Sequence, residues 1–172
     1  RNAAATDGEV CVAGIDQPMR IAALAYGAAE ALQWGVPARA VDFFDAKGDI
    51  EALLSPLQPQ FIADEHPALH PGRSARVQVN DQAIGWIGEL HPRWCRGYEL
   101  PSAQGAPVVF ELDLHAVLER PVPAASPLPR QQSVLRDLAL VVGEGVTHDA
   151  LISTLTDDAS GLVRSAQLFD LY

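Results

Sequence analysis

The sequence predicts an α+β fold, in which an antiparallel sheet with flanking helices is followed by a smaller β-α-β segment. Residues 73–90 carry a β-hairpin pattern, which is the strongest sign of antiparallel pairing in the chain. Residues 121–131 hold four prolines in eleven positions, a composition typical of an extended connector. Residues 132–172 then follow a strand, helix, strand pattern. We therefore expect a first domain at 1–120, a proline-rich linker at 121–131 and an incomplete second domain at 132–172.

In the hairpin, strand-like runs at 73–79 and 82–90 flank the pair Asn80-Asp81. Both residue types tolerate the positive φ that a two-residue hairpin turn requires. Because side chains alternate between the two faces of a strand, each run has one apolar face that should pack inward. The residues of this face are Ala75, Val77, Val79, Ile84, Trp86 and Gly88. His-Pro pairs at 70–71 and 91–92 frame the hairpin, since proline favours an extended conformation in the residue before it.

Before the hairpin, apolar runs at 10–15 and 20–26 predict two strands that pair with each other. A break at 34–37 leads into a helix that ends at Pro56 and Pro59. The predicted inner stripe of this helix is Val41, Phe44, Lys47, Ile50, Leu54 and Leu57. The pattern at 61–70 is irregular and predicts a loop.

After the hairpin, Pro92 stands where helices commonly begin and predicts one or two helical turns at 93–98. The pattern at 108–112 alternates and predicts a strand, and 115–119 predicts a short helix. In the second domain we expect a strand at 134–142 and another at 162–172. Between them, Thr147 can cap a helix that Gly161 ends. The inner stripe of that helix is Ala150, Leu151 and Leu155.

Composition excludes several classes of protein. At 172 residues and 48% apolar content the chain can bury a core, and its net charge of −10 argues against indiscriminate binding of nucleic acid. No run approaches the roughly 20 apolar residues that span a membrane, and no signal peptide pattern is present, so we expect a cytoplasmic protein. Two cysteines are too few for a disulfide framework. The first residue is not Met and the last residues continue an apolar run, so we expect both ends to be cuts in a longer polypeptide.

Longer strings point to a family. The chain resembles the C-terminal part of the β subunit of bacterial phenylalanyl-tRNA synthetase, and the resemblance covers nearly the whole chain. The strings that carry it, in order, are VDFFDAKGDIEALL, HPGRSA, IGWIGELHP, VFELDL, RQQSVLRDLALVV and LFDLY.

The resemblance implies an α₂β₂ ligase that joins phenylalanine to its tRNA with ATP and magnesium, with the adenylate chemistry on the α subunit. It implies that residues 1–120 form a class II synthetase-like antiparallel sheet without a working active site. It also implies that 132–172 begin a ferredoxin-like anticodon-binding domain. The partners would be the α subunit and phenylalanine tRNA, with no membrane. No catalytic residue, metal ligand or cofactor of its own is implied for this part of the enzyme.

The histidines suggest an alternative function. His66 and His70 have the i, i+4 spacing of a helical metal pair. A small metal-dependent hydrolase could use these two residues together with His91. Asp64 and Glu65 are further oxygen ligands nearby. The prolines that follow both His66 and His70 oppose a continuous helix, so we favour loop histidines that cap the backbone.

The arginines carry two further hypotheses. Class II active sites use arginines on the sheet to hold ATP phosphates. The resemblance suggests Arg73 and Arg76 as candidates for such arginines. We favour a structural motif at His70, Arg73, Glu89 and His91, in which Arg73 pairs with Glu89. Toward the end of the chain, Arg130 and Arg136 flank the first expected strand of the second domain and could contact tRNA phosphates. Arg136 could instead pair with Asp137, and both readings stay open.

Three other patterns have plain structural readings. Asp42 and Asp45 suggest paired carboxylates for acid–base chemistry. We instead expect them at the first turn of a helix, where their negative charges interact favourably with the helix dipole. Gly85 and Gly88 lie within a strand pattern, which favours a bulge or a close backbone approach over a phosphate loop. The three tryptophans are too scattered for a stacking platform and are expected to be core or subunit-interface anchors.

Overall fold

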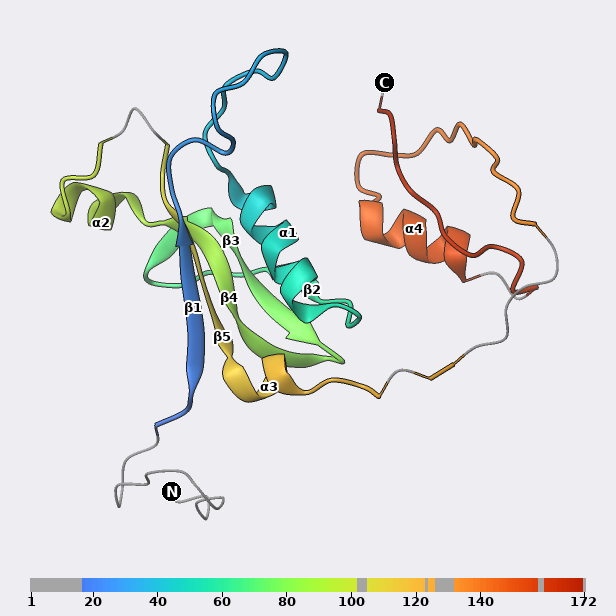
Figure 1. The fold of residues 1–172 in the computed structure, drawn as a ribbon, viewed down its shortest axis with the longest axis horizontal. Helices are drawn as coiled ribbons and strands as arrows, with labels where there is room; N and C mark the ends of the chain where they lie inside the picture. The colour runs from blue at the N-terminus through green and yellow to red at the C-terminus, as the bar shows by residue number, and fades with distance from the viewer. Residues whose placement is uncertain (1–16, 102–104, 123, 126–131, 158–159, 172) are drawn as a thin grey trace. The chain divides into compact units, whose positions relative to one another are not determined.

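The computed structural model describes residues 17–101, 105–122, 124–125, 132–157 and 160–171. The chain forms two compact units, Arg1–Ala124 and Ala125–Tyr172 (Figure 1). The predicted strand at 10–15 and most of the predicted linker lie outside the described residues, and the identity of the two domains stays a prediction.

The first unit is an α+β structure built on one five-stranded antiparallel sheet, as the sequence predicted in its coarser form. The strand order is β1-β5-β4-β3-β2. The strands are β1 (Arg20–Ala25), β2 (Gln60–Ala63), β3 (Leu69–Val79), β4 (Gln82–Leu90) and β5 (Val108–Asp113). The helices among the described residues of this unit are α1 (Phe43–Leu54), α2 (Pro92–Gly97) and α3 (Leu114–Leu118).

The predicted hairpin is present as β3 and β4. Asn80 and Asp81 have φ values of 51° and 63°, so the two residues form the tight turn that their side chains tolerate. The register is irregular between Leu69 and Ser74 and again between Val77 and Gln78. At the second place Val77 faces Gly85 whereas Gln78 faces Ala83. Ile84 is therefore an extra residue on β4, which is a β-bulge.

The bulge corrects one prediction. Ile84 stays in the core, but beyond the bulge the alternation reverses, and Ile87 rather than Trp86 faces inward. Trp86 lies on the opposite face of the sheet, directly across from Arg76. A strict two-residue period cannot reveal such a reversal, because the extra residue depends on the partner strand.

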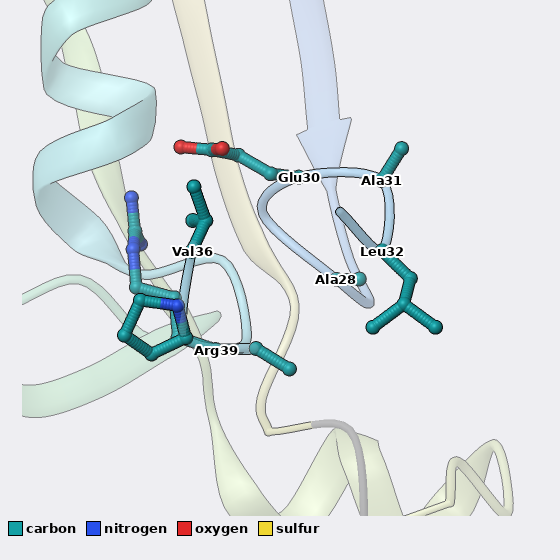
Figure 2. Close-up of a pocket in the computed structure, with 8 residues that line it drawn as sticks. Ala28, Glu30, Ala31, Leu32, Val36 and Arg39 are labelled. Carbon is teal, nitrogen blue, oxygen red and sulfur yellow. The ribbon is translucent and has the colours of Figure 1, made fainter. Parts of the chain in front are cut away.

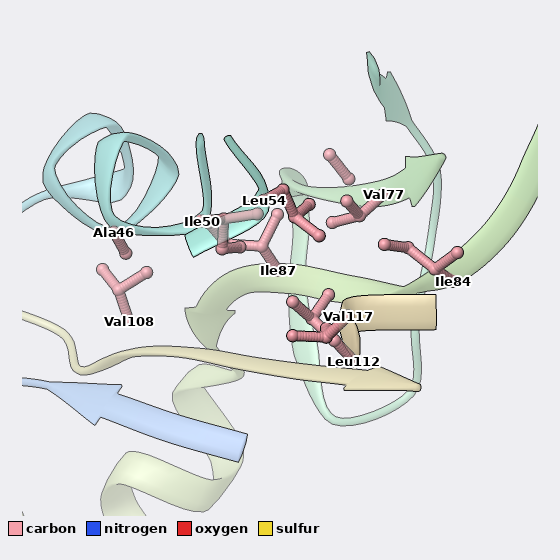
Figure 3. Packing of buried hydrophobic residues seen from close by; sticks show 10 residues of the cluster. Ala46, Ile50, Leu54, Val77, Ile84, Ile87, Val108, Leu112 and Val117 are labelled. Carbon is pink, nitrogen blue, oxygen red and sulfur yellow. The ribbon is translucent and has the colours of Figure 1, made fainter. Parts of the chain in front are cut away.

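The core lies between α1 and the sheet, as Figure 3 shows. From α1 it takes Ala46, Ile50 and Leu54, which recur every fourth residue along one face of the helix. Fully buried side chains of the size of Ile50 contribute about 1.5–3 kcal/mol each relative to exposure. Phe44, predicted on this stripe, is exposed because it lies about 200° around the helix from Ala46. Lys47 also leaves the stripe and places its ammonium group 5.2 Å from the ring centre of Phe61.

Two further predictions change. The region 61–70, expected to be a loop, contributes β2, which pairs along the edge of β3. The strand predicted at 20–26 forms as β1, and its partner within the described residues is β5. The predicted helical turns at 93–98, strand at 108–112 and short helix at 115–119 are confirmed as α2, β5 and α3.

The second unit contains the predicted helix without the predicted strands. Helix α4 (His148–Thr156) begins at Thr147, whose side-chain oxygen accepts a hydrogen bond of 3.2 Å from the Ala150 backbone amide. The helix ends at Thr156, before Gly161. The described residues at 132–142 and 160–171 form no strand, and their large apolar side chains are exposed. A strand needs a neighbour to satisfy its backbone, and the described residues of this unit provide none.

Within the described residues, no helix has the length and apolar content needed to cross a membrane.

Candidate functional site

The histidines beside the hairpin bind backbone groups. The Nδ1 atom of His66 accepts a hydrogen bond from the Ala68 amide at 3.3 Å, and that of His91 accepts one from the Arg93 amide at 3.1 Å. The His66 ring also lies against Trp86, with ring centres 5.1 Å apart. The contact of His66 agrees with its interpretation as a loop histidine that caps the backbone, and His91 makes the same kind of contact. The same expectation is wrong for His70, which lies within β3.

The hydrolase alternative has no metal centre in the described part of the chain. A shallow hollow beside the hairpin is lined by Glu65, His66, Pro67, Leu69, Pro71 and His91. His70 does not line this hollow, and its Nδ1 atom is buried without a hydrogen-bond partner. No group of three histidine, cysteine or acidic side chains among the described residues could hold a metal ion.

The predicted ion pair between Arg73 and Glu89 is present. The Nη1 atom of Arg73 lies 3.0 Å and 2.9 Å from the two carboxylate oxygens of Glu89. This pair joins the neighbouring edges of β3 and β4, next to Gly72, which has a positive φ of 99°. The pair engages the guanidinium group of Arg73 and supports its structural reading over a role in holding phosphate.

Arg76 is engaged in a similar way. Its guanidinium group forms an ion pair with Asp64 and lies 5.8 Å from the ring centre of Trp86. The sequence pattern does not reveal Asp64 as its partner, because that carboxylate reaches Arg76 only through the pairing of β2 with β3. With an acidic partner in contact, Arg76 is poorly suited to bind the phosphates of ATP.

The two aspartates at the start of α1 form a helix cap. Asp42 accepts hydrogen bonds from the Phe44 and Asp45 amides, and the Asp45 carboxylate accepts one of 2.9 Å from the Asp42 amide. Arg39 donates two further hydrogen bonds to Asp45, at 2.6 Å and 2.7 Å. These bonds, that from Arg39 above all, lower the pKa of Asp45 to about 2 and raise the pKa of Arg39. The pair is thus a structural cap, and the lowered pKa of Asp45 does not suit a general acid or base near neutral pH.

Arg39 also closes the base of an exposed loop at 27–41. The Ala29 amide donates to the Arg39 carbonyl at 3.0 Å, and the Val41 amide donates to the Gly27 carbonyl at 2.9 Å. The loop encloses a small hollow lined by short apolar side chains, Glu30 and Arg39 (Figure 2). Its Trp34 is 100% exposed and its Leu32 93% exposed. The loop therefore presents large apolar side chains on a braced base.

The candidate tRNA contacts are only partly described. Arg130 lies outside the described residues. Arg136 donates a hydrogen bond of 3.0 Å to the Leu135 carbonyl, and within the described residues it has no carboxylate partner. Of the two readings left open for Arg136, the ion pair with Asp137 is therefore not formed, and the tRNA role of both arginines stays a prediction.

The chain is similar to known β subunits. The model of a family described as "Phenylalanyl tRNA synthetase beta chain CLM domain" matches residues 6–114. A phenylalanine–tRNA ligase beta subunit of Ralstonia nicotianae is 54% identical over 162 residues, which cover 94% of this chain and 20% of the relative. Relatives with the same name from Burkholderia pseudomallei and Bordetella parapertussis are 51% and 47% identical, over 95% and 96% of this chain and 20% and 21% of the relatives. The chain thus spans about a fifth of the length of the curated relatives it matches.

Proposed function

The chain belongs to the family of the phenylalanyl-tRNA synthetase beta chain CLM domain, and we propose that it serves as part of the β subunit of a phenylalanine–tRNA ligase. This ligase would attach phenylalanine to its tRNA with ATP and magnesium in the cytoplasm. The observation that carries the proposal is about 50% identity to such subunits over nearly the whole chain.

In this proposal the first unit is a non-catalytic scaffold of class II synthetase type. Its five-stranded antiparallel sheet is compatible with that fold. The groups that could have served chemistry are used in structural contacts, since Arg73 pairs with Glu89 and Arg76 with Asp64. Chemistry with ATP and magnesium would occur on the α subunit. The second unit would begin a ferredoxin-like domain whose remaining strands cover the exposed apolar residues around α4.

The partners we propose are the α subunit, in an α₂β₂ assembly, and phenylalanine tRNA. The loop at 27–41 supports a contact with another protein, because a fully exposed tryptophan on a braced base is typical of an interface anchor. The surroundings of the loop include Glu30 and Asp42, which favour a protein surface over the phosphates of RNA. Anticodon-region contacts would come from Arg130 and Arg136.

Assembly with the α subunit tests the proposal. The full-length polypeptide that contains this chain should co-elute with the α subunit, and the complex should charge phenylalanine tRNA. In that complex Trp34→Ala should weaken the association by about 2 kcal/mol, the size of effect typical of an interface anchor. Leu118→Ala, at another exposed apolar side chain, is the matched control and should leave the association unchanged.

The isolated chain provides a second test. It should catalyse no phenylalanine-dependent exchange between ATP and pyrophosphate, because adenylate chemistry is assigned to the α subunit. Exchange by this chain would overturn the non-catalytic role. Failure of the full-length polypeptide to associate with the α subunit would overturn the assignment to the ligase.

A further inference from the structure

Helix α2 and the residues just after it form an exposed surface that no part of the proposed scaffold role uses. The helix follows β4 directly, and none of its residues is buried. Its position is nevertheless well held. The His91 amide donates to the Ala68 carbonyl at 2.9 Å, the Leu100 amide donates to the Cys95 carbonyl at 2.9 Å, and the Cys95 thiol lies 3.6 Å from the Leu90 carbonyl oxygen. The surface is therefore fixed to the end of the sheet before any partner arrives.

Two aromatic rings and a guanidinium group are stacked on this surface. Trp94 and Tyr98 stand one helical turn apart, with ring centres 6.3 Å apart and planes inclined by 25°. The guanidinium group of Arg93 lies 4.6 Å from the Trp94 ring centre. Tyr98 is 67% exposed, so most of its surface is accessible to a ligand. A flat, exposed aromatic ring beside cationic groups suits a nucleic-acid base better than an aliphatic side chain.

The charges on this surface are also unusual for the chain. Among the described residues of the first unit, the side chains of Arg93 and Arg96 have no carboxylate or carbonyl partner. The other cations there are bound to an acidic group or to backbone carbonyls, namely Arg20, Arg39, Lys47, Arg73, Arg76 and Arg120. In a chain with a net charge of −10, α2 thus carries two guanidinium groups without an acidic partner, and that of Arg93 lies against the Trp94 ring.

We propose that α2 is a contact surface for single-stranded RNA, on which Tyr98 and Trp94 stack bases while Arg93 and Arg96 bind phosphates. The inference rests on the proposed function for the source of the RNA, a single-stranded part of tRNA. The acidic remainder of the chain confines binding to this surface, because phosphates are repelled elsewhere.

The test measures binding of a labelled short single-stranded oligoribonucleotide to the chain by fluorescence anisotropy, across a series of salt concentrations. Tyr98→Ala should weaken binding on the order of tenfold, because one stacked base is lost. The double variant Arg93→Ala and Arg96→Ala should reduce the slope of log K against log salt by about 1.4, or about 0.7 for each phosphate released from contact. Arg20→Ala is the matched control, since Arg20 is already paired with Asp113, and should change neither quantity.

Thermal unfolding separates binding from folding. The variants should unfold at the same temperature as the unaltered chain, because α2 buries no side chain. Absence of RNA binding by the unaltered chain, an unchanged salt slope in the double variant, or binding of an acidic peptide in place of RNA would overturn the inference. Suppose that the assembled ligase charges tRNA normally and that the α2 variants bind tRNA as tightly as the unaltered enzyme. In that case this inference fails and the proposed function stands. If the assembled ligase does not charge phenylalanine tRNA, the proposed function fails instead.

Discussion

The two units place similar apolar sequences in opposite environments. In the first unit, Val77 and Ile87 on neighbouring strands are fully buried under α1. In the second unit, the apolar run at 134–142 has comparable composition, yet Leu135 is 91% exposed and no strand forms among the described residues. The difference teaches that alternation and β-branched residues favour a strand only where a second strand completes the backbone hydrogen bonds.

Helix α4 makes the same point from the other side. Its hydrogen bonds lie within the segment, and its first turn is capped by its own neighbour Thr147. A helix can therefore form before its apolar face finds a partner, although most helical stability in proteins comes from packing. Of the elements predicted for the second unit, the helix forms because its hydrogen bonds are local. The two strands, which need hydrogen bonds to a distant segment, do not form among the described residues.

The largest test of this contrast is truncation of an apolar side chain in each unit. Ile87→Ala should destabilise the first unit by about 2–5 kcal/mol, because it leaves a cavity in a closed core. Leu135→Ala is the matched change in the second unit and should have an effect below about 0.5 kcal/mol. Chemical denaturation of each variant measures both values. A loss of similar size at Leu135 would show that its side chain is buried in solution and would break the contrast.

The next test concerns glycines that lie close to the backbone of a neighbouring strand. Such close contact occurs in a packed sheet and not in an exposed segment. A Cβ atom at Gly85 would lie 2.8 Å from the Leu112 Cα atom and would also collide with the Glu111 carbonyl. Gly85→Ala should therefore destabilise the first unit by about 1–3 kcal/mol. Gly48→Ala is the control on the exposed side of α1, where nothing lies within 4 Å, and it should stabilise by about 0.5–1 kcal/mol. If both substitutions changed the free energy of unfolding in the same direction, the packing described for β4 and β5 would be contradicted.

Helix capping tests the second unit alone. Thr147→Ala removes the acceptor for the Ala150 amide and should destabilise α4 by about 1 kcal/mol, seen as a loss of helical signal in circular dichroism. Thr154→Ala, within the same helix, replaces a β-branched residue with the strongest helix former and should raise the helical signal. The unfolding transition of the first unit should be unchanged in both variants. A shift in that transition would mean that the units stabilise each other.

The smallest expected effect is the pH dependence at the start of α1. The pKa of Asp45 is lowered from its ordinary value of 3.8 to about 2 in the folded chain, so its contribution is complete above pH 3.8 and is lost as pH falls through about 2. The difference in unfolding free energy between the unaltered chain and Asp45→Asn should therefore shrink over that interval. Asp49→Asn, later in the same helix, is the control for the general effect of removing a negative charge. A difference that stays constant down to pH 2 would contradict the pairing of Asp45 with Arg39.

Sequence reasoning located the hairpin, the placement of Asp42 and Asp45 at the start of a helix, and the ion pair of Arg73 with Glu89. Each depends on residues close in sequence or on two strands joined by a tight turn. It missed the pairing of Arg76 with Asp64, which needs β2 at the edge of the sheet. It also judged the tryptophans too scattered for stacking, because the partner of Trp94 is Tyr98 rather than another tryptophan. The i, i+4 spacing of Trp94 and Tyr98 is visible in the sequence once tyrosine is counted together with tryptophan.

Residues near one another along the chain thus specified the turn at Asn80-Asp81, the caps of α1 and α4 and the family to which the chain belongs. Contacts between distant segments set which side chains are buried. The bulge at Ile84 exchanged Ile87 for Trp86 in the core, and the pairing of β1 with β5 joined residues almost ninety positions apart. The physical reason is that turns and caps satisfy their hydrogen bonds locally, whereas strand register and burial depend on a partner that local sequence does not contain.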